Sequence, residues 1–483
     1  MNWLDRFIFW LAKKRFLKRV LKAASKERLY KHWTLKDETP NAPLSDLPVV
    51  RARANYLYYN DPFIKGAVDL IVNRMIGGGS TPQARTDVDE FNKQAEALFQ
   101  QWAEDADIYG QFHFGDLERL AILKLFLDGG IFFKKVIDNR RRNPFCLEPI
   151  EYSRLAPEGT PFGKNQVIHG IEINPDTGNI VAYHFYTAYP QDYTVPIGRN
   201  IKRIPATSVI HFSPFRRPGQ LLGIPLLAPA IPYAYNLAEI IEAELITKKI
   251  EACFGIVIKT TDLYGRLQAE ETEEGDKVKE LAPGMIEYLG PGEDIEVVDP
   301  KRPGRSFKEF VDLILQGIAR ALGLSLEQIT GDKSKVNYSS TRHSELELRD
   351  YFLPFRKADE RYFLRPVWRL FIRYAIGAGL LKAPGYVKDP AYWEKHEWIF
   401  KGFDWVDPQK EAKAKVTELV MGATTLAEIC AAKGKDWQEV AKQRAREKEF
   451  LNGLGLSDVT QTNENRSSKV INGGKRNASN PIC

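Results

Sequence analysis

The 483-residue sequence predicts an α+β protein that is mainly helical. Apolar residues recur at steps of three and four in several long stretches, which is the period of an amphipathic helix. Residues 167–186 instead alternate apolar and polar positions around a turn that contains Asp176 and Gly178, a pattern typical of a β-hairpin. A hydrophobic content of 43% with 27% charged residues suits a folded soluble chain of two to four domains.

The first half of the chain is expected to mix helices and strands. We expect helices at residues 49–75, 88–103 and 114–128, and strands at residues 131–137 and 204–212. Gly77, Gly78 and Gly79 follow the first helix and predict its C-terminal stop. A loop at residues 216–220 follows the last of these strands.

An acidic segment is bracketed by two long helical patterns. Residues 226–252 predict a helix with Pro229 and Pro232 in its opening turns, and a strand follows at residues 254–259. Residues 262–301 then hold twelve acidic and four basic residues, a net charge of −8, with strand patterns at 285–289 and 295–298. We interpret this segment as a small acidic lobe at the tip of two helices.

Residues 306–352 predict a helix, a polar loop and a second helix. The stripe of the first helix is made by Phe307, Phe310, Val311, Ile314, Leu315, Ile318 and Leu322. Gly323 and Gly331 interrupt it, and Ser344 with Glu347 predicts a capping box that starts the second helix. By itself this pattern indicates an ordinary helix–loop–helix, and a loop presented to a ligand is the alternative.

The rest of the chain is predicted to be helical up to a polar tail. Pro354 and Pro366 should kink or divide the helix at residues 344–376. Residues 407–454 read as helices throughout, whereas residues from 455 onward are rich in Asn and Ser and should be disordered.

Positive charge is concentrated at the N-terminus. Residues 1–36 hold seven Lys and four Arg against Asp5 and Glu27, a net charge of +9. Because the whole chain carries +6, the remainder carries −3. Aromatic and aliphatic residues interleave with these cations, so the arm predicts an amphipathic basic helix. Such a helix could dock on a partner or a neighbouring subunit, lie on a membrane surface or bind nucleic-acid phosphates, and simple disorder of the arm is a further alternative.

The cysteines and histidines show no metal-site spacing. Cys146, Cys253, Cys430 and Cys483 are far apart, which argues against a zinc site or a disulfide framework and fits a reducing compartment. The seven histidines are scattered, and His184 and His211 on predicted strands are interpreted as structural. No apolar run is long enough to span a membrane, so we expect a cytoplasmic protein at synthesis.

No catalytic motif is present in the sequence. There is no GxxxxGK[ST], GxSxG or HExxH pattern, and the acidic pairs near residue 270 lie on an acidic surface. Composition therefore leaves three hypotheses: a structural assembly protein, a nuclease with an unrecognised site, and a peripheral membrane protein. Nothing in these motifs requires an enzyme, and we expect no cofactor and no metal.

Eight stretches, in order, resemble the portal proteins of tailed bacteriophages, specifically the lambda-type portal family. They are DPFIKGAVDLIVN (61–73), FLDGGIFF (126–133), IPATSVIHF (204–212), RPGQLLGIPLLAP (217–229), PGMIEYLGPGE (283–293), TGDKSKVNYSS (330–340), RPVWR (365–369) and DWQEV (436–440). The resemblance covers about residues 50–456 and implies a mainly helical, ring-forming portal fold with wing, stem, clip and crown regions.

The resemblance implies the following division of the chain. The regions are a basic arm and linker (1–48), an α+β wing (49–225), a stem helix (226–252), the clip (253–302), a second stem helix (303–330), the tunnel loop (331–343), a kinked helix returning to the wing (344–406), a helical crown (407–456) and a disordered tail (457–483).

Two groups of site residues follow from this division. The DNA-facing tunnel loop would be formed by Asp332, Lys333, Ser334, Lys335, Val336, Asn337, Tyr338 and Ser339. The clip surface that faces the terminase and later the connector would include Asp262, Glu270, Glu271, Glu273, Glu274, Glu293 and Asp294. Lys333 and Lys335 could contact translocating DNA or merely solvate the loop, and the family pattern does not decide between these.

The resemblance also implies partners and a location. The chain would form a homo-oligomeric ring, usually a dodecamer, around double-stranded DNA that it does not read for sequence. Its protein partners would be the terminase large subunit, the head–tail connector and the major capsid or scaffolding protein. The ring would sit at the portal vertex of the virion, with host cytoplasm as the site of assembly.

Overall fold

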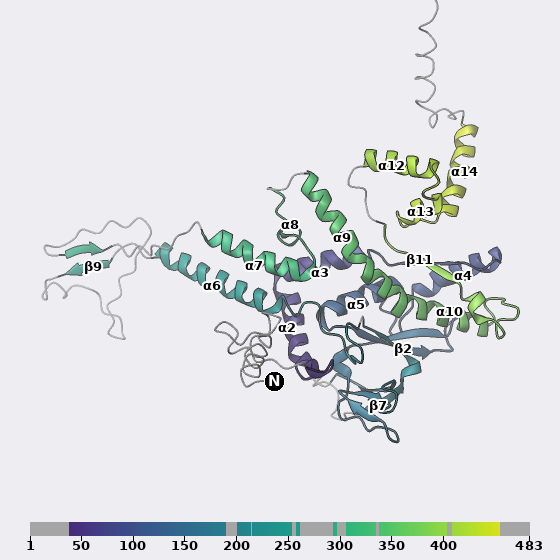
Figure 1. Cartoon of the computed structure of the whole chain (residues 1–483), viewed down its shortest axis with the longest axis horizontal. Helices are drawn as coiled ribbons and strands as arrows, with labels where there is room; N and C mark the ends of the chain where they lie inside the picture. Colours follow the sequence, from purple (N-terminus) through teal and green to yellow (C-terminus); the bar gives the residue numbers. More distant parts are fainter. Residues whose placement is uncertain are drawn as a thin grey trace, which may run out of the picture.

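The computed structural model describes most of the chain as connected helices and small sheets (Figure 1). The described residues are 38–189, 200–213, 215–253, 257–260, 293–296, 306–334, 338–402 and 408–454. The α+β prediction is confirmed, because long helices dominate and the described strands form four small sheets. The N-terminal arm, most of the acidic segment and the tail after residue 454 lie outside the described residues.

The central body combines helices with a three-stranded sheet. Its main helices are α2 (Leu47–Asn60), α3 (Pro62–Met75), α4 (Asp89–Ala103) and α5 (Phe114–Leu127). The sheet has the order β3 (Phe145–Ile150), β2 (Ile131–Ile137) and β8 (Val209–Phe212). The three predicted helical regions and the strand over 131–137 are thereby confirmed, with the first region divided at Pro62.

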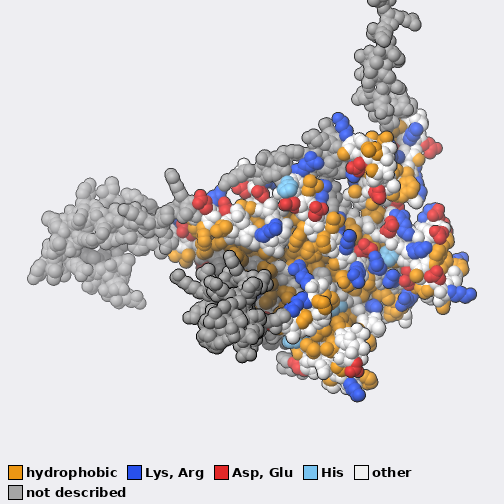
Figure 2. All heavy atoms as spheres, viewed as in Figure 1, with side chains coloured by type: hydrophobic (Ala, Val, Ile, Leu, Met, Phe, Trp, Pro, Cys, Tyr) orange, Lys and Arg blue, Asp and Glu red, His pale blue; other side chains and the backbone are white. Residues whose placement is uncertain are grey.

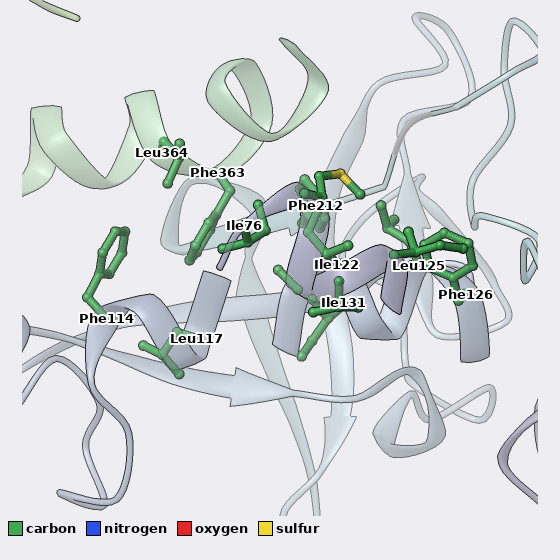
Figure 3. Close-up of a cluster of buried hydrophobic side chains, with 14 of the residues drawn as sticks. Ile76, Phe114, Leu117, Ile122, Leu125, Phe126, Ile131, Phe212, Phe363 and Leu364 are labelled. Atoms are coloured by element: carbon green, nitrogen blue, oxygen red, sulfur yellow. The ribbon is translucent and has the colours of Figure 1, made fainter. Parts of the chain in front are cut away.

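Strand β2 separates two hydrophobic clusters, because successive side chains of a strand point to opposite faces. Phe133 packs into the larger cluster, where its ring lies 4.4 Å from the ring of Phe363. Phe132 packs into the smaller cluster, 5.0 Å from the ring of Tyr152. Figure 3 shows side chains of the larger cluster gathered from α5, β2, β8 and the segment at Phe363 and Leu364.

A glycine pair carries the chain from α5 into β2. Gly129 has φ +86°, and a Cβ added there would lie 2.3 Å from the carbonyl oxygen of Gly223. Any larger residue would therefore push the neighbouring segment away.

A four-stranded antiparallel sheet lies beside this body. Its order is β4 (Gln166–Ile168), β5 (Ile171–Ile173), β6 (Ile180–Tyr186) and β7 (Ile201–Pro205). The predicted hairpin is confirmed as the β5–β6 pair, and Gly178 in its turn has φ +72°.

The prediction of one strand over residues 204–212 is wrong. The short 3-10 helix Ala206–Ser208 interrupts the stretch, so that β7 pairs with β6 and β8 pairs with β2. One extended sequence thus supplies strands to two different sheets.

Two helices extend from the body toward a separate strand pair (Figure 1). They are α6 (Ile231–Cys253) and α7 (Ser306–Leu322), which lie side by side. Beyond them β9 (Val257–Thr260) pairs antiparallel with β10 (Glu293–Glu296). The predicted strand at 285–289 lies outside the described residues, and the partner of β10 is the strand after α6.

The stripe of α7 is only partly buried. Ile314, Leu315, Ile318 and Leu322 lie in the core, whereas Phe310 is 49% exposed. The body therefore covers the C-terminal half of this helix, and its N-terminal half projects with α6.

A long helical segment then crosses the molecule. It consists of α9 (Tyr338–Asp359), a π-helix η7 (Glu360–Leu364) and α10 (Arg365–Gly377). Pro354 lies inside α9, and Pro366 opens α10 directly after the π-helix. The predicted division of this helix is confirmed, and its site is the wider π turn at which Phe363 and Leu364 enter the core.

The predicted capping box at Ser344 is wrong. Helix α9 already includes Tyr338, so Ser344 lies inside it. A short helix that the sequence pattern did not indicate, α8 (Leu326–Thr330), occupies part of the connection from α7.

Three helices complete the described chain: α12 (Pro408–Val420), α13 (Leu426–Ala431) and α14 (Trp437–Gly453). They confirm the helical prediction for residues 408–453, with breaks at 421–425 and 432–436, and residue 407 lies outside the described residues. Before them, β1 (Thr81–Ala84) pairs with β11 (His396–Ile399), close to the short helix α11 (Pro390–Trp393).

Candidate nucleic-acid interface

The predicted loop emerges from a tight helical connection. Gly323 turns the chain after α7 with φ +72°, and α8 then ends at Gly331, which also has φ +72°. The amide of Gly331 donates to the carbonyl of Glu327 at 2.9 Å, which closes the last turn of α8. These contacts fix the direction in which the loop leaves the body.

The structure describes three of the predicted loop residues as an exposed turn. Asp332, Lys333 and Ser334 are all exposed, and Asp332 Oδ1 accepts the amide of Ser334 at 2.9 Å. Residues 331–334 contain one acidic and one basic residue, Asp332 and Lys333, and so have no net formal charge.

The remaining loop residues divide into two groups. Lys335, Val336 and Asn337 lie outside the described residues, while Tyr338 and Ser339 form the first turn of α9. The loop is therefore shorter than the sequence predicted.

An ion pair ties the beginning of α9 to α3, beneath the loop. Arg74 Nη1 and Nη2 each donate to one carboxylate oxygen of Glu345 at 3.2 Å. This two-bond geometry resists rotation of either side chain. A cavity of about 190 Å³ lies beside the pair, and Gly331, Lys333, Leu70 and Leu348 are among the residues that line it.

A buried acidic pair lies further along α9. Glu118 on α5 and Asp359 at the end of α9 are both 0% exposed. Glu118 accepts the amide and the hydroxyl of Ser80 at 2.7 and 2.6 Å. Burial raises the pKa of Glu118, and burial together with the charge of Glu118 raises the pKa of Asp359 well above its ordinary value. Both shifts disfavour two charged carboxylates side by side in this buried site.

Arg356 lies close to this acidic pair but donates elsewhere. Its guanidinium donates to the carbonyls of Met75 and Lys401 at 2.8 Å each, and burial lowers its pKa to about 10. The C-terminal part of α9 is thus joined to the ends of α3 and β11.

The predicted clip residues are only partly described. Glu293 and Asp294 lie on β10, in register with Thr260 and Lys259 of β9. Asp262, Glu270, Glu271, Glu273 and Glu274 lie outside the described residues.

The two strand histidines have hydrogen-bonding roles in the small sheets. His184 Nε2 lies 3.0 Å from Glu172 Oε2, and His211 lies 2.7 Å from the hydroxyl of Tyr152 and 3.2 Å from that of Tyr183. Burial lowers the pKa of His211 to about 3, so this ring stays neutral. These contacts support the structural interpretation of both residues.

Searches of the described residues found neither a metal site nor a membrane span. In the part of the chain that the structure describes, no three His, Cys, Asp or Glu side chains gather as metal ligands. Within the same residues, no helix is long and apolar enough to cross a membrane. Cys146 and Cys430 are buried free thiols.

Sequence reasoning did not find the Arg74–Glu345 pair or the Glu118–Asp359 pair. Each joins residues more than 200 positions apart, so no local spacing could indicate it. Residues 114–127 contain Asp116, Glu118, Arg119 and Lys124, so the local sequence does not single out Glu118 as the buried acid.

Comparison with known proteins identifies relatives over most of the chain. The sequence model described as "Phage portal protein, lambda family" matches residues 26–356. The probable portal protein of Halomonas phage phiHAP-1 is 25% identical over 463 residues, covering 91% of this chain and 88% of the relative. Portal protein B of Escherichia phage lambda is 21% identical over 460 residues, covering 84% of each.

Solved structures give a more distant likeness. A chain from the virion of a native gene transfer agent particle is 14% identical, with a TM-score of 0.46, and the match covers 84% of this chain and 98% of that chain.

Proposed function

The chain belongs to the lambda family of phage portal proteins, and we propose that its copies form a ring at one capsid vertex through which double-stranded DNA is packaged and ejected. The ring, most often a dodecamer in this family, is a structural part of the virion. The chain itself is not an enzyme in this proposal, since a separate terminase motor drives translocation. Assembly takes place in the host cytoplasm.

The exposed loop at residues 331–334 is the observation that carries the DNA-facing part of this proposal. It leaves the body between α8 and α9, and the Arg74–Glu345 pair supports it from below. The loops of all subunits would line the channel and narrow it around the duplex. Lys333 and Lys335 would give weak contacts to phosphates that add up around the ring.

The local charge suits passage of DNA rather than tight binding. Asp332 lies next to Lys333, so that the described part of the loop attracts phosphates only weakly. A strongly cationic constriction would hold a duplex in place, since each phosphate contact contributes to affinity.

We assign the other regions by the same division of the chain. The body at residues 49–225 and 344–406 is the wing, α6 and α7 are the stem, and α12 to α14 belong to the crown. The β9–β10 pair belongs to the clip, which docks the terminase and then the head–tail connector through its acidic residues. The N-terminal arm would contact the major capsid or scaffolding protein.

Imaging of the purified full-length protein by negative stain tests this proposal. We expect rings with a central hole wide enough for a duplex. Monomers or compact particles without a hole, at the concentrations used for packaging, would contradict it.

A further inference from the structure

A row of four arginines runs along the solvent side of the π-helix and α10. Arg361, Arg365, Arg369 and Arg373 follow one another at steps of four, which places them close to one helical face. The side chains of the last three are 44%, 54% and 58% exposed, and Arg361 is exposed as well. At about 1.5 Å per residue, neighbours in this arginine row are about 6 Å apart along the axis.

The opposite face of α10 fixes the orientation of the row. Val367, Trp368 and Phe371 are 0% exposed and pack in the larger hydrophobic cluster. Because this face is anchored in the core, the arginines cannot turn inward without unpacking the body. Figure 2 shows Lys and Arg side chains, with some acidic ones, over the part of the body where Figure 1 places α10.

The row has fewer carboxylate neighbours than it has cations. Arg365 Nη2 pairs with Glu360 Oε1 at 2.8 Å. Glu394 lies 3.7 Å from Arg369 Nε and 3.9 Å from Arg373 Nη2, which are beyond hydrogen-bond length. Four guanidinium groups thus face two carboxylates among the described residues, and one of these is shared.

Other groups make this carboxylate deficit larger. Glu394 Oε1 already accepts the hydroxyl of Tyr386 at 2.7 Å. Lys135 on β2 is close enough to Arg373 for this charge, together with burial, to lower the pKa of the lysine. Like charges at four-residue spacing destabilise a helix, and a bound polyanion would relieve this cost.

The row is well separated from the tunnel loop. Arg361 is 23 residues beyond Tyr338, and Arg373 is 35 residues beyond it, along one helical segment. At the helical rise this is about 35 to 50 Å. Figure 1 shows α9 and α10 running across the body with the loop region at the far end of α9. DNA bound to the arginine row would therefore be a different part of the duplex from the part that passes the tunnel loop of the same subunit.

We propose that the arginine row binds the phosphate backbone of double-stranded DNA outside the constriction made by the tunnel loops. Guanidinium groups match the two accepting oxygens of a phosphate, and the regular spacing of the row suits a regular polyanion. The excess of guanidinium groups over carboxylates favours a polyanion as the ligand, and double-stranded DNA is the polyanion that the proposed function brings to this protein. The choice of double-stranded DNA as the ligand rests on the proposed function. The inference adds to that function a second contact with DNA, one that does not depend on the DNA sequence.

The test compares full-length variants in binding to a random-sequence duplex across a salt series. The variant Arg365→Gln, Arg369→Gln and Arg373→Gln should reduce the slope of log affinity against log salt by about 2 to 3, because each phosphate contact contributes about 0.9. At about 100 mM salt its affinity should fall by roughly tenfold or more. The basic N-terminal arm is present in every variant, so its contribution to the salt slope is the same in each and cancels when the slopes are compared.

Two further variants control for charge and for folding. Lys442→Gln, Arg444→Gln and Arg446→Gln remove the same charge from the exposed face of α14 and should leave the slope unchanged. Replacing Arg365, Arg369 and Arg373 by Lys should keep the slope while weakening the affinity, since the charge stays and the two-bond geometry is lost.

Three outcomes would overturn the inference. The first is an unchanged salt slope in the triple Arg→Gln variant, and the second is an equal loss of slope in the α14 control. The third is a triple Arg→Gln variant that binds DNA as the wild type does but no longer forms rings, which would assign the arginine row to contacts between copies of the chain. Failure of the wild-type protein to form rings would instead defeat the proposed function, whereas the slope comparison could still be made on single chains.

Discussion

Glu172 on β5 offers a sharp test of how the four-stranded sheet is held together. Its carboxylate is 0% exposed and accepts from Arg203 Nε at 2.7 Å and Nη2 at 3.0 Å. Asn165 Nδ2 and the amide of Phe162 donate to it at 2.6 and 3.2 Å, and His184 Nε2 lies at 3.0 Å. One carboxylate thus connects β5, β6, β7 and the loop before β4.

The Glu172→Gln change keeps the shape of this side chain and removes its charge. Hydrogen bonding to Arg203 lowers the pKa of Glu172 from 4.5 to about 2. At about 1.4 kcal/mol per pKa unit, this lowering of the pKa corresponds to at most about 3.5 kcal/mol of folding stability. Because the Arg203 side chain is 35% exposed and therefore partly screened, we expect a loss of about 2 kcal/mol.

The sign of the pH dependence follows from the lowered pKa. The contribution is fully present above pH 4.5, the ordinary value, and is lost as the pH falls toward about 2. The Gln variant lacks this contribution at every pH. The difference between wild type and variant should therefore shrink as the pH is lowered from 6 to 3.

Amide hydrogen exchange of the β5 and β6 peptides measures this local stability as protection factors at each pH. Glu397→Gln serves as the control, since it removes an exposed pair with Arg85 at 2.9 Å and should cost no more than about 1 kcal/mol. A change below about 0.5 kcal/mol at Glu172, or an equal difference at pH 6 and pH 3, would refute the reasoning.

Three other perturbations test the acidic pair, the loop and the arm. Asp359→Asn should make thermal stability less dependent on pH, because the raised pKa of Asp359 costs the wild type stability as the pH rises above the ordinary value of 3.8. A melting-temperature difference between wild type and variant that does not change as the pH rises above 4 would argue against the raised pKa. The double variant Lys333→Ala, Lys335→Ala should lower the DNA packaging yield and weaken the salt dependence of that yield. If the yield and its salt dependence both stay unchanged, the two lysines do not contact the DNA phosphates. Deleting residues 1–36 should impair incorporation into capsids more than ring formation, measured by imaging and particle composition; a deletion that abolishes rings would show that the arm acts within the ring.

Helices could be predicted from the sequence because their signal is local. The apolar positions of α7 lie three and four residues apart, so the buried stripe of Ile314, Ile318 and Leu322 can be seen in any window of the chain. The hairpin turn around Gly178 is equally local, since its geometry depends on the residues of the turn itself. The order of eight motif stretches likewise identified the family from the sequence alone.

Only the tertiary structure decided which distant segments meet. Residues 204–212 look like one strand, but β7 and β8 pair with different sheets because each finds its hydrogen-bonding partner elsewhere in the chain. Ser344 was expected to cap a helix, yet it lies inside α9, and the next residue, Glu345, pairs with Arg74, 271 positions away. Such partners are selected by packing and by the burial of charge, and neither leaves a periodic signal in the sequence.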